Sequence, residues 1–308
     1  MLDLSDRITV LRRGRKIGTV RAADTSKEEL ARMMVGREVL FTSLKEPRAP
    51  GETVFELESL SYTGPEGRER LKDVDIVVRA GETVGIAGVE GNGQFELVNT
   101  IMGLLPIQSG RLVVDGQNLT HATILERRRK ISFVSQDRAH MSASLSAPIK
   151  ENVVMTHHRL DDRFTRLGGL VMDYRKAAEF ADEVRDRFAV TMDNVEDEFR
   201  SLSGGNQQKV ILGRELLLDT PFVLLDQPTR GLDVGSIEYV HRQILDLRQA
   251  GRAVLLISAD LDELFRITDR ILVLSRGRIV ADLPTEATDI EEVGYLMLEG
   301  TRDETKAN

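Results

Sequence analysis

The sequence predicts an α/β fold with a mixed β-sheet core, an antiparallel β subdomain and a helical subdomain. Short apolar runs bounded by turn residues fit buried parallel strands, and segments with helical spacing follow several of them. Glycine-rich turns join a strand to a helix at two places in the chain. The clearest buried strands cover residues 83–87, 222–225 and 253–258.

The composition is that of a globular chain with a sizeable core. Hydrophobic residues make up 41% of the 308 positions and charged ones 30%, with both signs mixed along the chain. A net charge of -8 argues against a nucleic-acid binder. The lack of cysteine excludes disulfides, thiol nucleophiles and cysteine-based metal sites. Because no apolar run approaches the roughly 20 residues of a membrane span and no signal peptide is visible, we expect a cytosolic protein.

Two local features have an ordinary interpretation. The basic run at residues 127–130 predicts a solvated helix face rather than a binding patch. His157 and His158 show no metal-ligand spacing, and the pair is predicted to be exposed.

The first part of the main body predicts three strands and a helix. Residues 53–62 and 70–78 have the alternation of half-buried strands. The buried strand at 83–87 runs into a glycine-rich segment, and apolar residues at helical spacing follow over 96–103.

The second part alternates helices and strands. After a strand at 131–134, residues 142–200 are mainly helical in pattern, with helices over 149–155 and 174–188 separated by a break at Gly168 and Gly169. The remaining elements are a strand, a helix, a strand, a helix and a closing hairpin, at residues 222–225, 236–249, 253–258, 261–267 and 271–283.

The N-terminal residues repeat a segment near the end of the chain. The run DRITVL at residues 6–11 and the run RGR at 13–15 recur as DRILVL at 269–274 and RGR at 276–278, at a constant offset of 263 residues (269 − 6). Each copy predicts a hairpin that leads into a short amphipathic helix. Because the period is about one domain, we interpret residues 1–37 as the end of a preceding domain, 38–52 as a linker, 53–300 as the main domain and 301–308 as a tail.

Three motifs point to a phosphate site. The run LSGGNQQK at residues 202–209 places an N-cap serine and two glycines at a helix start, where bare amides can hold an anion. The strand at 222–225 delivers Asp226 to its carboxyl end, where a carboxylate can hold a metal or water. Gly88 and Gly93 have the spacing of a Walker A loop between a strand and a helix. Singly, a capped helix and a core strand are ordinary, so their order and spacing decide the interpretation.

The runs LSGGNQQK, LLDQPTRGLD and GVEGNGQ together resemble the signature motif, the Walker B strand with its D-loop, and the Walker A loop of ATP-binding cassette (ABC) proteins. From residue 53 to about 300 the chain looks like the second cassette of the tandem ATPases that serve monosaccharide and nucleoside importers. The resemblance implies a P-loop NTPase-like fold with a helical subdomain at about 142–205 that faces a membrane partner. Residues 1–37 are then the end of a preceding cassette.

The resemblance also implies the site residues. Nucleotide contacts are expected from Tyr62 on adenine, from the Walker A loop, from the Q-loop and from Walker B, at Tyr62, Gly88, Gly91, Asn92, Gly93, Gln94, Phe95, Gln136 and Asp226. Gln136 and Asp226 are the expected Mg²⁺ ligands. The signature is intact at Ser203, Gly204, Gly205 and Gln207, and Asp233 belongs to the D-loop. In the family two cassettes close head to tail, and each ATP lies between the Walker motifs of one and the signature of the other.

Four positions depart from the pattern of a hydrolytic site. Gln94 replaces the phosphate-binding lysine, and Phe95 replaces the hydroxyl that ligates Mg²⁺. Gln227 stands at the position of the catalytic glutamate and Ala259 at that of the switch histidine. Loss of a general base typically costs about 10²- to 10⁴-fold in rate. We therefore expect this cassette to bind nucleotide weakly and hydrolyse it very slowly, while its signature completes the ATP site of the partner cassette.

The function that this resemblance implies is that of the ATP-binding subunit of an importer for simple sugars or nucleosides, with ATP and Mg²⁺ as cofactors. Its expected partners are a first cassette, transmembrane permease subunits and, indirectly, a solute-binding protein, without nucleic acid. The expected location is the cytoplasmic face of the plasma (inner) membrane, through the permease. Three alternatives stay open: a competent ATPase in which Gln94 and Gln227 replace lysine and glutamate, a non-transport ABC factor, and a regulatory or structural partner domain that does not hydrolyse ATP.

Overall fold

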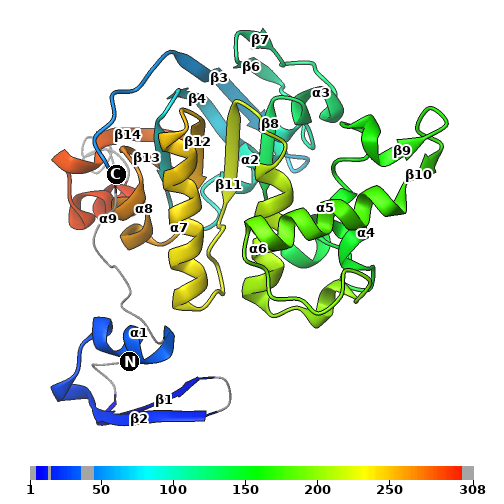
Figure 1. Cartoon of the computed structure of the whole chain (residues 1–308). Helices are drawn as coiled ribbons and strands as arrows, with labels where there is room; N and C mark the ends of the chain where they lie inside the picture. Colours follow the sequence, from blue (N-terminus) through cyan, green and yellow to red (C-terminus); the bar gives the residue numbers. More distant parts are fainter. Residues whose placement is uncertain (1–4, 13–14, 36–44, 300–308) are drawn as a thin grey trace.

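The computed structural model describes residues 5–12, 15–35 and 45–299 (Figure 1). A six-stranded sheet in the order β14-β13-β5-β12-β11-β8 lies at the centre. Five of its strands, β5, β8, β11, β12 and β13, are mutually parallel, and β14 pairs antiparallel with β13 at the edge. Their bounds are β5 (Thr83–Ala87), β8 (Ile131–Val134), β11 (Phe222–Asp226), β12 (Ala253–Ile257), β13 (Arg270–Ser275) and β14 (Arg278–Pro284). The predicted mixed α/β fold is confirmed.

The central strands are apolar on both faces because both faces of the sheet are covered. In β11, Phe222 and Leu224 face one apolar cluster, whereas Val223 and Leu225 face the other. All four side chains are fully buried. This explains why the sequence shows a continuous apolar run here instead of an alternating one.

One face of the sheet packs against an antiparallel sheet and a helix. Four strands in the order β4-β3-β6-β7 form the antiparallel sheet, and α2 (Gln94–Met102) shares its apolar cluster. The rings of Phe55 and Phe222 stack across the two sheets with their centroids 4.2 Å apart. The strands are β3 (Thr53–Thr63), β4 (Glu69–Arg79), β6 (Ser109–Val114) and β7 (Gln117–Asn118).

Helices cover the opposite face, and a mostly helical region extends to one side (Figure 1). The predicted break at Gly168 and Gly169 is the tip of a small hairpin, which the sequence analysis missed. Within the described ranges, no helix combines the length and apolar character that a membrane crossing requires. The elements are α4 (Ile149–Val154), β9 (Thr165–Arg166), β10 (Val171–Met172), α5 (Tyr174–Arg187), α6 (Gly204–Leu216), α7 (Val234–Gln249) and α8 (Leu261–Ile267). The short helix α3 (Ile124–Arg128) contacts α2 instead.

The two repeated segments fold alike. The first comprises β1 (Arg7–Arg12), β2 (Arg15–Arg21) and α1 (Lys27–Val35), and its element starts lie 263 residues before those of β13, β14 and α9 (Ile290–Glu299). A register shift interrupts both hairpins at corresponding positions, between Val10 and Leu11 and between Val273 and Leu274.

A matching hydrogen bond closes each repeat. The Ala22 N–H donates to the Asp6 carbonyl, and the Thr285 N–H donates to the Asp269 carbonyl, both at 3.0 Å. The turn residues Arg13 and Gly14, residues 38–44 of the predicted linker 38–52 and the predicted tail 301–308 lie outside the described residues. The assignment of residues 1–37 to a preceding domain stays a prediction.

Two predictions of exposed polar side chains are wrong. Arg127 is 2% exposed, and its Nη1 donates to the carbonyls of Thr100 and Ile101 at 2.6 and 2.7 Å. These carbonyls belong to the last turn of α2, where helix carbonyls lack their usual donors; the Gly103 N–H donates to Thr100 at 3.2 Å, and the buried guanidinium supplies hydrogen bonds to both carbonyls. His157 is also 2% exposed and its ring lies 4.9 Å from that of Phe180.

Candidate functional site

A cleft of about 930 Å³ lies at the carboxyl ends of the parallel strands. This is the edge where open α/β sheets place their ligands, because the loops after several strands converge there. The loops after β5, β8, β11 and β12 all line it. The predicted residues that it brings together are Gly88, Gly91, Gln94, Phe95, Gln136, Asp226, Gln227 and Ala259.

The loop between β5 and α2 has the backbone that a phosphate cradle needs. Gly91 and Gly93 have φ angles of +92° and +114°, in the left-handed region that favours glycine. A Cβ on Gly93 would lie 2.9 Å from the Arg70 carbonyl oxygen. Asn92 shapes the loop, since its Oδ1 accepts from the Arg276 N–H at 3.2 Å. The loop ends on the N-terminal amides of α2, a position suited to anions.

Gln94 and Phe95 give the cradle neither a cation nor a hydroxyl. The Gln94 Nε2 donates back to the Val89 carbonyl at 3.0 Å, and its Oε1 is buried without a hydrogen-bond partner. Phe95 is 60% exposed and its ring lines the cleft. The positions that usually supply charge and a metal ligand therefore supply a neutral amide and a hydrocarbon ring.

Asp226 stands at the end of β11 and is only 6% exposed. Burial raises the pKa of its carboxyl group to about 6, although a hydrogen bond from the Gln136 backbone and the charge of Arg230 lower it. The Arg230 Nη1 also donates to the Gln136 Oε1 at 3.2 Å. Asp226, Gln136 and Arg230 thus form one polar group on the floor of the cleft.

The residues present do not fit a Mg²⁺ ion. Magnesium demands near-octahedral oxygen coordination. Phe95 offers no oxygen, and the Gln136 Oε1 already accepts from Arg230. The described part of the chain has no group of three or more acidic or histidine side chains that could hold a metal. Ligation by Gln136 and Asp226 stays a prediction, and no chemical step is derived from it.

Gln227 and Ala259 contact each other just beyond the ends of the neighbouring strands β11 and β12. The Gln227 Oε1 accepts from the Ala259 N–H at 3.3 Å, and the Gln227 N–H donates to the Ile257 carbonyl at 2.9 Å. Gln227 has a φ of +50°, a left-handed conformation that is costly for a side chain of this size. The arrangement holds an amide where a general base would stand, and an amide does not accept the proton of an attacking water.

The signature motif lies away from the cleft and faces outward. Ser203 and Gly204 are exposed, and Ser203 caps α6 by accepting from the Asn206 N–H at 3.4 Å. The Gln207 Nε2 donates to the Leu202 carbonyl at 3.0 Å, which fixes the loop before the cap. None of the four signature residues lines the cleft.

The signature touches the D-loop of the same chain. A Cβ on Gly205 would lie 2.3 Å from the Ser236 Oγ and 3.3 Å from the Asp233 Oδ2. Asp233 caps α7 and accepts from the Ser236 N–H at 3.1 Å and from its Oγ at 2.8 Å. A side chain at 205 would therefore have to displace the Ser236 hydroxyl, and the two motifs lie against each other.

Tyr62 is not placed to contact a nucleotide in the cleft. Its side chain is 7% exposed in β3, within the apolar cluster between the two sheets, and it does not line the cleft. Adenine stacking by Tyr62 stays a prediction that this geometry does not support.

Two arginines of the site escaped the sequence analysis. Arg230 donates a hydrogen bond to Gln136, which lies 94 residues earlier in the chain, and Arg138 Nη1 donates to the Gly204 carbonyl at 3.1 Å. Arg230 lies inside the quoted run LLDQPTRGLD. Its presence in that run was the available signal, but spacing alone does not reveal a contact with a distant loop.

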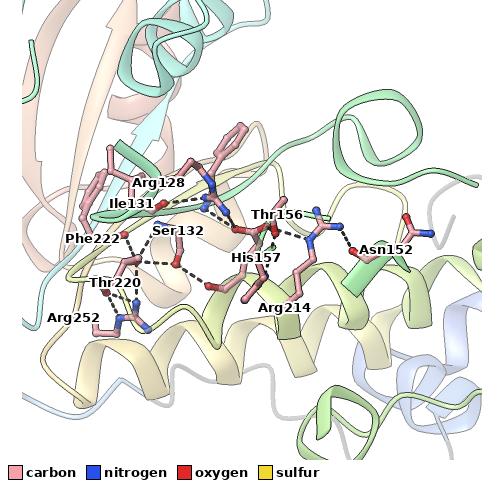
Figure 2. Close-up of polar contacts among 12 residues, drawn as sticks. Arg128, Ile131, Ser132, Asn152, Thr156, His157, Arg214, Thr220, Phe222 and Arg252 are labelled. Carbon is pink, nitrogen blue, oxygen red and sulfur yellow. Dashed lines mark hydrogen bonds and ion pairs between the residues drawn. The ribbon is translucent and has the colours of Figure 1, made fainter. Parts of the chain in front are cut away.

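A buried polar network fixes the elements that carry the cleft and the signature (Figure 2). Glu215, at the end of α6 and 1% exposed, accepts from Arg128 Nη2 at 2.5 Å and from Arg214 Nε at 3.1 Å. Its backbone carbonyl accepts from the Ser132 Oγ of β8 at 2.7 Å. Burial alone would raise the pKa of Glu215, but the two arginines hold it at about 2.

Comparisons with known proteins show which proteins the chain is similar to. A family model described as "ABC transporter" matches residues 71–230. The glucose import ATP-binding protein TsgD13 of Haloferax volcanii is 43% identical over 300 residues, which cover 96% of this chain and 54% of that protein. The guanosine import ATP-binding protein NupO of Bacillus subtilis is 40% identical over 314 residues, which cover 99% of this chain and 60% of that protein. The chain thus spans a little over half the length of these relatives.

The fold matches a solved structure as well. The dimeric structure of MJ0796, a bacterial ABC transporter cassette, superposes with a TM-score of 0.64 at 24% identity. The match covers 76% of this chain and 100% of that one.

Proposed function

Because the chain belongs to the ABC transporter family, we propose that it is the ATP-binding part of an importer for simple sugars or nucleosides. The printed functions of its relatives, which are glucose, guanosine, nucleoside and ribose import, support this substrate class. By the same similarity, the chain works at the cytoplasmic face of the membrane with permease subunits, and a solute-binding protein delivers the solute.

Within that assembly this cassette has an intact signature motif, but its own cleft does not hydrolyse ATP. The observation that carries this proposal is the contrast between two surfaces of one chain. The cleft presents Gln94, Phe95 and an amide–alanine pair where a hydrolytic site needs a cation, a hydroxyl, a base and a histidine. The signature presents an exposed serine hydroxyl and helix-start amides.

The chain's residues divide the work accordingly. The amides of the loop from Gly91 to Gln94 hold phosphate at the N-terminus of α2. Gln227 orients water without taking its proton. Ser203 and Gly204 present a hydroxyl and amides to a nucleotide held by the partner cassette, where hydrolysis of ATP supplies the energy for transport.

The repeat supports a tandem architecture for the full-length protein. Residues 5–12 and 15–35 have the hairpin, the register shift and the helix that close the main domain at 270–299. We infer that residues 1–37 end a first cassette, that 38–52 form a linker and that 53–300 form the second cassette. That first cassette is the partner whose bound nucleotide contacts the signature motif of this chain.

The test is ATP hydrolysis by the isolated chain. We expect turnover at background in the presence of Mg²⁺, because the cleft lacks a base and a phosphate-binding cation. Robust Mg²⁺-dependent turnover that is abolished by Asp226→Asn would contradict the proposal. Titration with a fluorescent ATP analogue separates it from the alternative of a regulatory partner domain that binds no nucleotide.

A further inference from the structure

We propose that the cleft of this chain binds nucleotide phosphates without Mg²⁺, and that the Arg230 guanidinium is the cation that pairs with them. The inference rests on the proposed function, since it concerns the same cleft, and it names the ligand class as a metal-free nucleoside di- or triphosphate.

The first step is the loss of the metal site. At the first turn of α2 the ring of Phe95 occupies the cleft, where an oxygen ligand would be needed. The Gln136 Oε1 accepts from Arg230 at 3.2 Å, so one of the two remaining oxygen donors is already bonded to a fixed positive charge. A divalent cation at that oxygen would be repelled by the adjacent guanidinium, and Phe95 leaves it without the oxygen ligand expected at the first turn of α2.

The second step is the supply of positive charge. Among the described residues that line the cleft, Arg230 is the only cationic one. Gln94, at the position where the family has lysine, is neutral and bonds back to Val89. A phosphate that enters the cradle therefore finds its counter-charge on Arg230, in the loop after β11, and not at the start of α2.

The third step is the geometry of the guanidinium. Arg230 is exposed, and the hydrogen bond seen for its side chain within the described chain is the one to Gln136. A guanidinium has five N–H donors in a planar fork, so a bidentate phosphate contact remains available. The Arg138 Nη2 donates to the Arg230 backbone carbonyl at 3.4 Å, which helps to hold the D-loop side of the cleft.

The charge balance also sets the strength of binding. The carboxylates of Glu90, Asp226, Asp260 and Asp262 line the same cleft. One guanidinium does not offset these groups together with a free triphosphate, so binding is weak. This agrees with the weak nucleotide binding expected from the sequence.

The experiment is titration of the chain with N-methylanthraniloyl-ATP in a buffer with Mg²⁺ and in a buffer with EDTA. We expect the dissociation constant in EDTA to stay within about twofold of that with Mg²⁺, or to fall below it. Binding that weakens by about tenfold or more in EDTA would overturn the inference and leave the proposed function standing. If the chain does not bind the analogue in either buffer, the nucleotide-binding part of the proposed function fails.

Variants assign the charge to Arg230. Arg230→Ala should weaken binding in EDTA by roughly tenfold or more, the usual effect of losing a hydrogen bond to a charged group, and Arg230→Lys should recover part of it. Arg187→Ala removes an exposed arginine of α5 that pairs with Glu183 at 3.0 Å, and should leave binding unchanged. An unchanged dissociation constant for a folded Arg230→Ala variant, checked by circular dichroism, would refute the role of Arg230.

Discussion

Replacing Glu215 by glutamine should destabilise the whole cassette, because it leaves two buried arginines without a counter-charge. The side chains of Arg214 and Arg128 are 3% and 11% exposed, and both contact the carboxylate (Figure 2). Removing one partner from a buried ion pair typically costs about 3 to 5 kcal/mol. The pKa gives a similar figure: a value of about 2 against the ordinary 4.5 corresponds to about 3 kcal/mol.

The pH dependence of Glu215→Gln has a definite sign. The folded-state pKa of Glu215 lies below the ordinary value, so the unfolded chain binds the proton more readily between pH 4.5 and about 2. The stabilisation is therefore complete above pH 4.5 and is lost as the pH falls. At pH 3.5 the difference between the wild-type chain and the variant should shrink by roughly 1 kcal/mol.

The assay is urea unfolding at pH 7.5 and pH 3.5, followed by circular dichroism. Glu196→Gln is the matched control, because Glu196 also pairs with a cation, Lys150, at 2.6 Å, but its side chain is 55% exposed. An exposed pair contributes about 0 to 1 kcal/mol, so the control should change little. A loss below about 1 kcal/mol for Glu215→Gln at pH 7.5 would refute the ion-network argument.

Two further substitutions test other parts of the structure. His157 is buried and its pKa falls from 6.5 to about 4, chiefly through burial, so the unfolded chain binds more protons between these values and stability is lost as the pH drops. At pH 5 the wild-type chain should lose about 2 kcal/mol of unfolding free energy that His157→Phe retains, and equal acid sensitivity in urea unfolding would contradict this. Gly205→Ala should clash with the Ser236 Oγ and break its bond to Asp233, at a cost of about 1 kcal/mol, and the added Ser236→Ala should recover part of that cost by removing the clashing hydroxyl. If the double variant is no more stable than the single one, the close-approach explanation for Gly205 fails.

The central sheet could be predicted from the sequence because its strands are short runs of apolar residues, which are stable only when they are buried. The strands β5 and β8 have the predicted bounds, since a buried apolar run that ends at glycine or serine allows few other interpretations. The helix α8 also has the predicted bounds. The strand β6 was missed because it begins with Ser109 and Gly110, and its pairing with β3 is fixed by distant residues.

The burial of charged side chains could not be predicted from the neighbouring residues in the sequence. Arg127 reads as one of four adjacent cations, yet carbonyls at the end of α2, 26 and 27 residues earlier, make its burial favourable. The motif residues around the cleft were predicted because they lie within recognisable runs. The contact of Arg230 with Gln136 joins two loops through the fold, and no spacing in the sequence indicates it.

The most direct test of the division of labour uses the full-length tandem protein that we propose. Transport-coupled ATP hydrolysis should be lost in Ser203→Arg, because the bulky cation blocks the surface offered to the partner cassette. It should largely persist in Asp226→Asn, because the cleft of this half does not hydrolyse ATP. Loss of hydrolysis in Asp226→Asn together with normal turnover in Ser203→Arg would contradict the account.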